Sequence, residues 1–235
     1  MNALLVGIGG LGCPAAIALA RAGVGTIGIA DDDLVDVTNL HRQILFDERD
    51  VGRSKVQAAA RRLAELAPGV RIVAHETRLL PSNAVELVSA YDVVVEGSDN
   101  FATKFLAADA AAIANKPIVH GAAVRWHGTA LAVGPGGGPC YRCLFEDVPR
   151  ENAPNCAEAG VVGPLVGVVG AVQADLALSI LRGEDVLGTL FTFDGKTLAS
   201  RRRRIPSRPG CPLCGAAKDI TSIDGARYAA VACEI

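Results

Sequence analysis

The stretch ALLVGIGGLGCPAA at residues 3–16, followed by TIGIADDD at residues 26–33, decides the fold. An apolar run at residues 3–8 predicts a buried strand, and an alanine-rich segment at residues 13–22 predicts a helix, with a glycine-rich turn between them. Residues 26–30 read as a second strand. Strand, glycine turn, helix and strand form a βαβ unit with a right-handed crossover, so we expect an α/β fold.

The alternation of strands and helices continues along the chain and then changes. We expect further strands at residues 71–75, 92–96 and 117–122, and helices at residues 54–66, 83–90 and 101–115. After Gly128 we expect strands at residues 129–133, 189–193 and 197–204, and a long helix rich in small residues at 160–182. The sequence therefore predicts a Rossmann-like, mostly parallel sheet with helices on both faces, followed by C-terminal antiparallel strands.

Three parts of one domain follow from this pattern. We expect a nucleotide-binding half at residues 1–135, and a second part at 136–219 with a cysteine knuckle, a crossover loop, the long helix and the antiparallel strands. A polar loop is expected at 147–158, and a loose or docked tail at 220–235.

Composition excludes several classes of protein. Of 235 residues, half are apolar and a fifth are charged, which are globular proportions. The net charge of -2 gives no reason to expect nucleic acid or an anionic membrane as partner. The apolar N-terminus lacks a basic region and is interrupted by glycines, unlike a signal peptide. The uncharged helical stretch at 159–174 ends at Asp175, too short for a membrane span. We expect a cytoplasmic enzyme.

The first motif is a glycine loop before the first helix. Glycines let the backbone approach a phosphate, and the helix N-terminus that follows favours anions. The loop fits a dinucleotide, a mononucleotide or a plain tight turn. Asp31 ends the second strand, where a carboxylate accepts hydrogen bonds from a ribose, but Asp32 and Asp33 follow it, and an NAD site needs only one acid. The loop glycines are Gly7, Gly9, Gly10 and Gly12.

The second motif adds cations. The stretch NLHRQ supplies Asn39, Arg42 and Gln43, and Lys55 opens the next helix. Arg42 can hold phosphate oxygens in a bidentate fork and Lys55 can act as a point charge, which suits a triphosphate better than NAD. The alternative is that both are solvated surface charges.

The third motif is the stretch GSDN at residues 97–100, after the fourth strand. Carboxyl ends of strands in an open α/β sheet face the ligand crevice. Asp99 there can bind Mg²⁺ on nucleotide phosphates, with Asn100 donating hydrogen bonds. The alternative is that Asp99 caps the next helix.

Seven cysteines, without an export signal, argue against a disulfide framework. Two C-x-x-C pairs supply four thiolates for a closed, structural zinc site, with a disulfide or a redox pair as the alternative. We expect Cys13 to pack as a small apolar residue, and Cys156 to be either a reactive thiol or a plain loop cysteine. The four candidate zinc ligands are Cys140, Cys143, Cys211 and Cys214.

Together these motifs resemble the ThiF/MoeB/HesA family, bacterial relatives of the ubiquitin-activating enzymes. The resemblance extends from Leu4 to Cys214 and implies a reaction at the glycine loop, where ATP and Mg²⁺ bind. There the C-terminal carboxylate of a ubiquitin-like sulfur-carrier protein ending in Gly-Gly attacks the α-phosphate, giving an acyl-adenylate and pyrophosphate. The matching stretches are VGIGGLGCPAA, DDDLVDVTNLHRQILF, GRSK, GSDN, GAAVRWHG, PCYRCL and EAGVVGPLVGVVGAVQA.

The resemblance also implies roles for single residues. Gly10 lets the backbone approach the phosphates, and Asp31 holds the ribose. Asp99 matches the family's Mg²⁺-binding aspartate, and a cysteine near Cys156 handles the activated carrier in sulfur-transfer members. The implied phosphate contacts are Asn39, Arg42 and Lys55.

Some expectations concern partners. Family members usually begin with a segment whose arginine reaches the partner subunit's ATP; Leu4 already lies in the first strand, so we expect that segment to be missing. A homodimer and a separate sulfur donor are expected by resemblance, and the arginines at 201–204 fit an exposed strand or a patch for an acidic carrier. The alternative functions are a catalytically silent carrier-binding scaffold and an NAD-dependent oxidoreductase.

Overall fold

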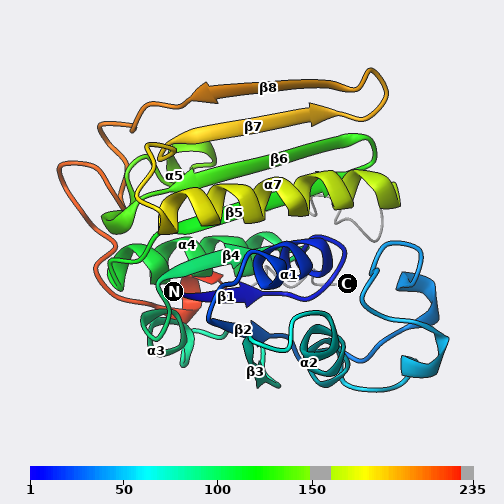
Figure 1. The fold of residues 1–235 in the computed structure, drawn as a ribbon. Helices are drawn as coiled ribbons and strands as arrows, with labels where there is room; N and C mark the ends of the chain where they lie inside the picture. The colour runs from blue at the N-terminus through cyan, green and yellow to red at the C-terminus, as the bar shows by residue number, and fades with distance from the viewer. Residues whose placement is uncertain (149–159, 229–235) are drawn as a thin grey trace, which may run out of the picture.

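The computed structural model describes residues 1–148 and 160–228. One eight-stranded sheet runs through the molecule in the order β3-β2-β1-β4-β5-β6-β7-β8 (Figure 1). The first five strands in this order are parallel, and the last three are antiparallel to their neighbours. The strands are β1 (Asn2–Val6), β2 (Thr26–Ala30), β3 (Arg71–His75), β4 (Val93–Glu96), β5 (Ile118–Val124), β6 (His127–Val133), β7 (Thr189–Asp194) and β8 (Ala199–Arg204).

The strand order places a crevice at the ends of β1 and β4. The chain moves outward from β1 to β2 and β3, then returns to β4 on the other side of β1. Val6 therefore pairs with Ala30 on one side and with Glu96 on the other. Connections leave these strand ends in opposite directions, and ligands bind at such a switch point in open α/β sheets.

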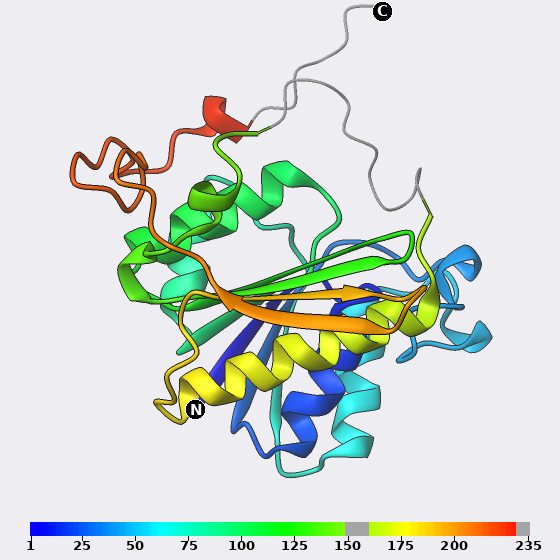
Figure 2. The same ribbon diagram turned by 90° about the horizontal axis from the view of Figure 1, so that it is seen from above.

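Helices cover both faces of the sheet. Figure 2 shows α1, α2 and α7 on one face, with α3, α4 and α5 on the other. Each layer closes its own apolar core, which contains Leu19 and Leu63 on the first face and Phe105 and Leu106 on the second. The helices are α1 (Gly12–Arg21), α2 (Lys55–Leu66), α3 (Ala84–Ser89), α4 (Phe101–Ile113), α5 (Tyr141–Leu144) and α7 (Gly163–Leu181), and the 3₁₀ turns are η1 (Val37–Asn39), η2 (Glu48–Asp50), η3 (Pro135–Gly137) and η4 (Gly225–Tyr228).

Helix α7 starts three residues later than the sequence predicts. Gly160 has φ of +73°, outside the helical region, and Pro164 lies in the first turn, where its missing N–H costs nothing. Helix α7 is long and apolar enough to cross a membrane. Half of its apolar stretch is buried inside the protein, however, and the helix packs on α1, β5 and β6. It is the core helix of this fold.

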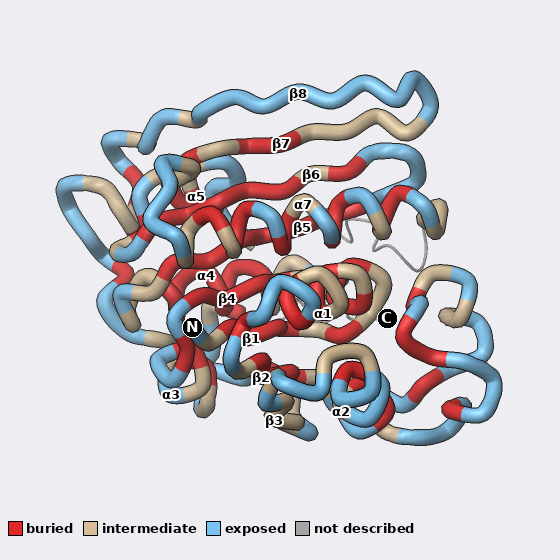
Figure 3. The backbone as a smooth tube through the Cα atoms, in the orientation of Figure 1, coloured by how far each residue is buried: buried red, intermediate tan, exposed pale blue. Residues whose placement is uncertain are grey.

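The predicted fold class is confirmed, and β2 and β3 have the bounds that the sequence predicts. The tail is docked as far as the structure describes it, because Ile220 and Tyr228 are buried. Strand β8 is exposed along its whole length (Figure 3), as expected for the arginine run. Most of the polar loop expected at 147–158, and the end of the tail, lie outside the described residues.

Candidate active site

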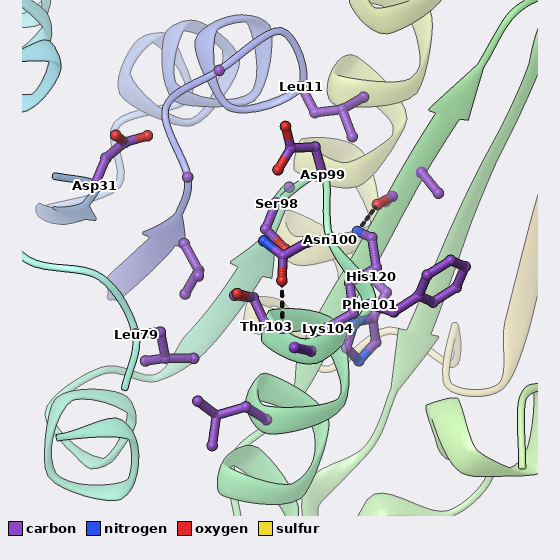
Figure 4. Close-up of a pocket in the computed structure, with 18 of the residues that line it drawn as sticks. Leu11, Asp31, Leu79, Ser98, Asp99, Asn100, Phe101, Thr103, Lys104 and His120 are labelled. Atoms are coloured by element: carbon purple, nitrogen blue, oxygen red, sulfur yellow. Dashed lines mark hydrogen bonds between the residues drawn. The ribbon is translucent and has the colours of Figure 1, made fainter. Parts of the chain in front are cut away.

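A cavity of about 960 Å³ opens at the switch point between β1 and β4. Its walls come from the glycine loop, the end of β2, the start of α4 and strands β5 and β6. Figure 4 shows Asp31 on one side of this space and Ser98 and Asp99 on another. This volume is at the upper end of the range for cofactor and substrate sites.

The glycine loop holds the carboxylate of Asp31 by a backbone contact. The amide of Ile8 donates to Asp31 Oδ2 at 2.9 Å, and the amide of Asp33 donates to Oδ1 at 2.9 Å. Burial raises the pKa of Asp31, whereas these amides and the charge of Lys55 act in the opposite direction. The carboxylate is thus fixed at the cavity edge before any ligand arrives.

Positively charged side chains form ion pairs with the acidic triplet at residues 31–33. Lys55, whose side chain is only 6% exposed, donates from Nζ to Asp33 Oδ2 at 2.8 Å. Arg78 donates from Nε to both oxygens of Asp32, at 2.7 and 2.8 Å, and it also lines the cavity. Arg78 was missed by the sequence analysis because it follows β3, 46 residues from Asp32. These positive charges surround one side of the cavity, where a polyanion would lie.

Arg42 and Gln43 approach the glycine loop from the η1 segment. A Cβ placed on Gly10 would lie 3.5 Å from Arg42 Cγ, and one on Gly9 would lie 3.6 Å from Gln43 Nε2. Gln43 is 4% exposed, and its Oε1 is buried without a hydrogen-bond partner among the described residues. An unpaired buried acceptor beside a glycine loop fits a ligand that donates a hydrogen bond there.

Two predicted residues that the structure describes, Gly12 and Asn39, do not line this cavity. Gly12 opens α1, and a Cβ there would overlap the carbonyl of Gly7, so this glycine is needed for close packing of the loop on the helix. Asn39 ends η1 outside the cavity. Cys156 lies outside the described residues, and so does Cys233.

The turn after β4 presents Asp99 to the cavity. Asp99 is exposed and lines the wall, with no hydrogen bond or ion pair from its side chain among residues 1–148 and 160–228. The cap of α4 is Asn100, whose Oδ1 accepts from the amide of Thr103 at 2.8 Å (Figure 4). The alternative that Asp99 caps this helix is therefore wrong, and its carboxylate is available to a cation.

A buried polar network lies beneath this turn, and the sequence analysis did not identify it. Glu96 Oε2 accepts from Lys104 Nζ at 2.9 Å and lies 3.2 Å from His120 Nδ1. Burial lowers the pKa of His120, although Glu96 opposes the shift. A proton on Nδ1 would face the Glu96 carboxylate. The Nε2 atom of His120 has no partner among the described residues, and the ring packs 4.6 Å from that of Tyr141. Trp126 and His127, in contrast, are exposed.

The two C-x-x-C pairs converge at the far end of α4. All four sulfur atoms lie within 4.8 Å of one another, with Cys140 Sγ 3.4 Å from Cys211 Sγ and Cys143 Sγ 3.3 Å from Cys214 Sγ. A tetrahedral zinc ion with bonds of about 2.3 Å requires sulfurs about 3.8 Å apart. The amide of Arg208 donates to Cys143 Sγ at 3.3 Å. The cluster fits zinc, and no described cysteine forms a disulfide.

Cys13 behaves as predicted. It is fully buried, its Sγ donates to the carbonyl of Ile8 at 3.3 Å, and burial raises its pKa to about 12. This thiol is a packing residue beneath the glycine loop.

The family comparison agrees with the motifs. The sequence model of the ThiF family matches residues 1–213. The chain belongs to the ThiF family. It is 42% identical over 222 residues to the sulfur carrier protein adenylyltransferase of Thermus thermophilus, covering 91% of this chain and 82% of that protein. It is 44% identical over 226 residues to the adenylyltransferase and sulfurtransferase MOCS3 of Anopheles gambiae, covering 94% and 51%.

The ThiF-family chain spans about half the length of its MOCS3 relatives. Among solved structures it shares its fold with E. coli MccB, at a TM-score of 0.80 and 21% identity, covering 91% of this chain and 65% of that chain. A structure of MccB with ATP gives a TM-score of 0.76 at 22% identity, with coverage of 91% and 66%.

Proposed function

We propose that this ThiF-family protein uses ATP to adenylate the C-terminal glycine of a ubiquitin-like sulfur-carrier protein. A carboxylate oxygen of the carrier bonds to the α-phosphorus, and the bond from that phosphorus to the bridging oxygen of pyrophosphate breaks. The products are the carrier acyl-adenylate and pyrophosphate. No general base is needed, because the carboxylate is already ionised at neutral pH.

One observation carries this proposal. One cavity is lined by a glycine loop, a fixed Asp31 carboxylate and a cationic side at Lys55, Arg78 and Arg42. Asp99 lines the same cavity, and its side chain has no partner among the described residues. A nucleoside triphosphate needs this set of ribose, phosphate and metal contacts, whereas an NAD site has no use for the cations. The adenylyltransferase names of the relatives point to the same chemistry.

In the proposed mechanism the chain positions the substrate and neutralises charge. The backbone at Gly9 and Gly10 approaches the phosphates, and Asp31 accepts hydrogen bonds from the ribose. Arg42 and Lys55 exchange their present contacts for phosphate oxygens, and Asp99 is the residue that would hold Mg²⁺. Mg²⁺ supplies neutralisation of charge on the phosphate oxygens. Because such catalysis depends on placement, these side chains need only be held at the cavity wall.

Three supporting roles are part of the proposal. We propose that Asp33 and Gln43 orient the groups that surround the phosphates. Asn100 caps α4 and so fixes the turn after β4. Asn39 is not among the residues that line the cavity, so we assign it no direct contact with the phosphates. The cysteine cluster has a structural role and holds α5 to the C-terminal knuckle.

The test is isotope exchange between pyrophosphate and ATP with a panel of carriers ending in Gly-Gly. We expect carrier-dependent exchange that Asp99→Ala reduces by at least about a hundred-fold, since removing one strong charge contact from a transition state costs this much. Folded protein that binds ATP but supports no exchange with any carrier would favour the silent-scaffold alternative.

Other expectations remain predictions. The small residues of α7 that could allow close contact with a second helix differ in their surroundings: Gly163 and Gly170 pack against the chain's own His41 and Leu11, while Gly167 faces open space. The homodimer, the separate sulfur donor, the cytoplasmic location and a role for Cys156 therefore need their own experiments.

A further inference from the structure

Glu96 is a fully buried carboxylate at the end of β4, three residues before Asp99. Both of its oxygens are occupied. Oε1 accepts from the amide of Ser98 at 2.7 Å and from the Ser98 hydroxyl, and Oε2 accepts from Lys104 at 2.9 Å and faces His120 at 3.2 Å. One carboxylate thus connects the turn that carries Asp99 to α4 and to β5.

We propose that Glu96 is a positioning residue for the cation site at Asp99. This inference rests on the proposed function, in which Asp99 holds Mg²⁺. Ser98 is the residue directly before Asp99, and both its amide and its hydroxyl are fixed by Glu96, so the direction in which Asp99 leaves the backbone is set by that carboxylate. Outer partners that orient a metal ligand affect metal affinity although they never touch the ion.

Lys104 makes this support rigid. Its side chain is 7% exposed, and Nζ donates both to Glu96 and to the carbonyl of Gly121 at 2.6 Å. Both charges are buried, so each requires the other. Three elements that surround the cavity floor therefore meet at one ion pair: β4 through Glu96, α4 through Lys104 and β5 through Gly121.

Other contacts hold the backbone at the start of this turn: Gln173 Nε2 donates to the Glu96 carbonyl at 2.7 Å, and the Gly97 amide donates to the Val6 carbonyl at 3.0 Å. Asp99 and Asn100 are exposed, and the side chain of Asn100 is used at the start of α4. Gly97 adds no side chain. Among the described residues, the hydrogen bonds to Glu96 are thus the main side-chain contacts that fix the backbone just before Asp99.

The test measures how exchange between pyrophosphate and ATP depends on Mg²⁺ concentration in Glu96→Gln and Ser98→Ala. Glu96→Gln keeps the shape but replaces one acceptor oxygen by a donor group and removes the charge that faces Lys104. We expect the Mg²⁺ concentration for half-maximal exchange to rise by about ten- to a hundred-fold, with a smaller change in the rate at saturating Mg²⁺. Ser98→Ala keeps the backbone hydrogen bond and should give a smaller rise.

Three further variants, at two positions, separate positioning from folding. Asp109→Asn alters an equally buried carboxylate on the same helix, paired with Arg142 rather than with the turn. It should lower the melting temperature and leave the Mg²⁺ dependence unchanged. Lys104→Arg keeps the charge that faces Glu96 and should stay near wild type, whereas Lys104→Met should shift the Mg²⁺ dependence as Glu96→Gln does.

The outcomes distinguish this inference from the proposed function. The positioning role alone is overturned if the wild type is active and a folded Glu96→Gln has an unchanged Mg²⁺ dependence. It is also overturned if Asp109→Asn shifts the Mg²⁺ concentration for half-maximal exchange as much as Glu96→Gln does. If Glu96→Gln does not fold, Ser98→Ala and the Lys104 pair give the answer. A wild type without Mg²⁺-dependent exchange for any carrier overturns the proposed function and this inference together.

Discussion

Helix α4 carries a buried ion pair near each end, and the two pairs serve different parts of the molecule. Lys104 pairs with Glu96 beneath the cavity, and Asp109 pairs with Arg142, which lies between two cysteines of the cluster. All four side chains are less than a tenth exposed. One pair supports a turn that a ligand would contact, and the other attaches α5 and the C-terminal segment. Burial and charge alone therefore do not distinguish a residue of the site from a structural residue. The distinction depends on which segment the ion pair contacts, the turn at the cavity or the cysteine cluster.

Removing metal from the cysteine end should have the largest effect. Without a cation, the four sulfur atoms of the cluster no longer bind a shared metal ion. Metal binding at structural zinc sites contributes on the order of 10 kcal/mol to folding. We expect one zinc per chain by elemental analysis and a large fall in melting temperature with a strong chelator. Cys13→Ala, outside the cluster, should keep the zinc; zinc-free protein with an unchanged melting temperature would contradict the assignment.

The Arg142 pair should be the next most sensitive. Arg142 donates to both oxygens of Asp109, at 2.8 and 2.9 Å, and Tyr228 donates to Oδ2 at 2.7 Å. Arg142→Met leaves a buried carboxylate with only the tyrosine, and we expect a loss of about 3–5 kcal/mol in the free energy of unfolding, measured in urea. Adding Asp109→Leu should recover part of the loss. A cost below about 1 kcal/mol would mean that the pair is dispensable.

The Glu96 pair can be tested by acid. Burial by itself would raise the pKa of Glu96, but Lys104 and the contacts with His120 and Ser98 outweigh it and lower the pKa to about 2. A depressed pKa contributes stability that is present above the unfolded value of 4.5 and is lost as pH falls towards 2. The contribution is on the order of 3 kcal/mol. Unfolding of wild type and Glu96→Gln can be followed by circular dichroism as the pH is lowered through this window. The wild type should lose its advantage in free energy of unfolding; a difference between the two proteins that stays constant with pH would argue against the depressed pKa of Glu96.

An exposed pair should have the smallest effect. Arg62 and Glu65 lie three residues apart on α2, with side chains 53% and 56% exposed and an N–O distance of 2.9 Å. Solvent screens such pairs, so Arg62→Ala should change the free energy of unfolding by no more than about 0.5 kcal/mol. A loss comparable to that of Arg142→Met would remove the contrast between buried and exposed pairs.

The sequence was sufficient for the fold because its signals are local. Glycines and apolar runs mark the ends of the strands, and the first βαβ unit fixes the crossover. The N-terminal end of α7 was placed too early, since the sequence alone does not show the positive φ of Gly160. Short elements such as α5, four residues that follow Cys140 and include Cys143, have no periodic pattern to detect.

Motif spacing predicted several residues that line the cavity, and the sequence analysis missed those whose partners are distant in the chain. The glycine loop, Asp31, Lys55 and Asp99 stand in recognisable motifs, but Lys104 and Asp109 read as ordinary charges on a helix. Their partners arrive from β4 and from α5, 33 residues after Asp109. One signal was present: Glu96 follows three valines of a buried strand, and a carboxylate there requires a buried cation.

Strand β8 has a consequence for the protein at high concentration. Among the described strands it pairs with β7 alone, so in this part of the chain its outer edge offers backbone groups to which another sheet could add. Residues 201–204 are all arginines and all exposed. Two such edges side by side would bring eight guanidinium groups within about 5–10 Å of one another, and their repulsion opposes fibre-like stacking of these molecules. The arginine run at residues 201–204 thus opposes self-association through the sheet edge.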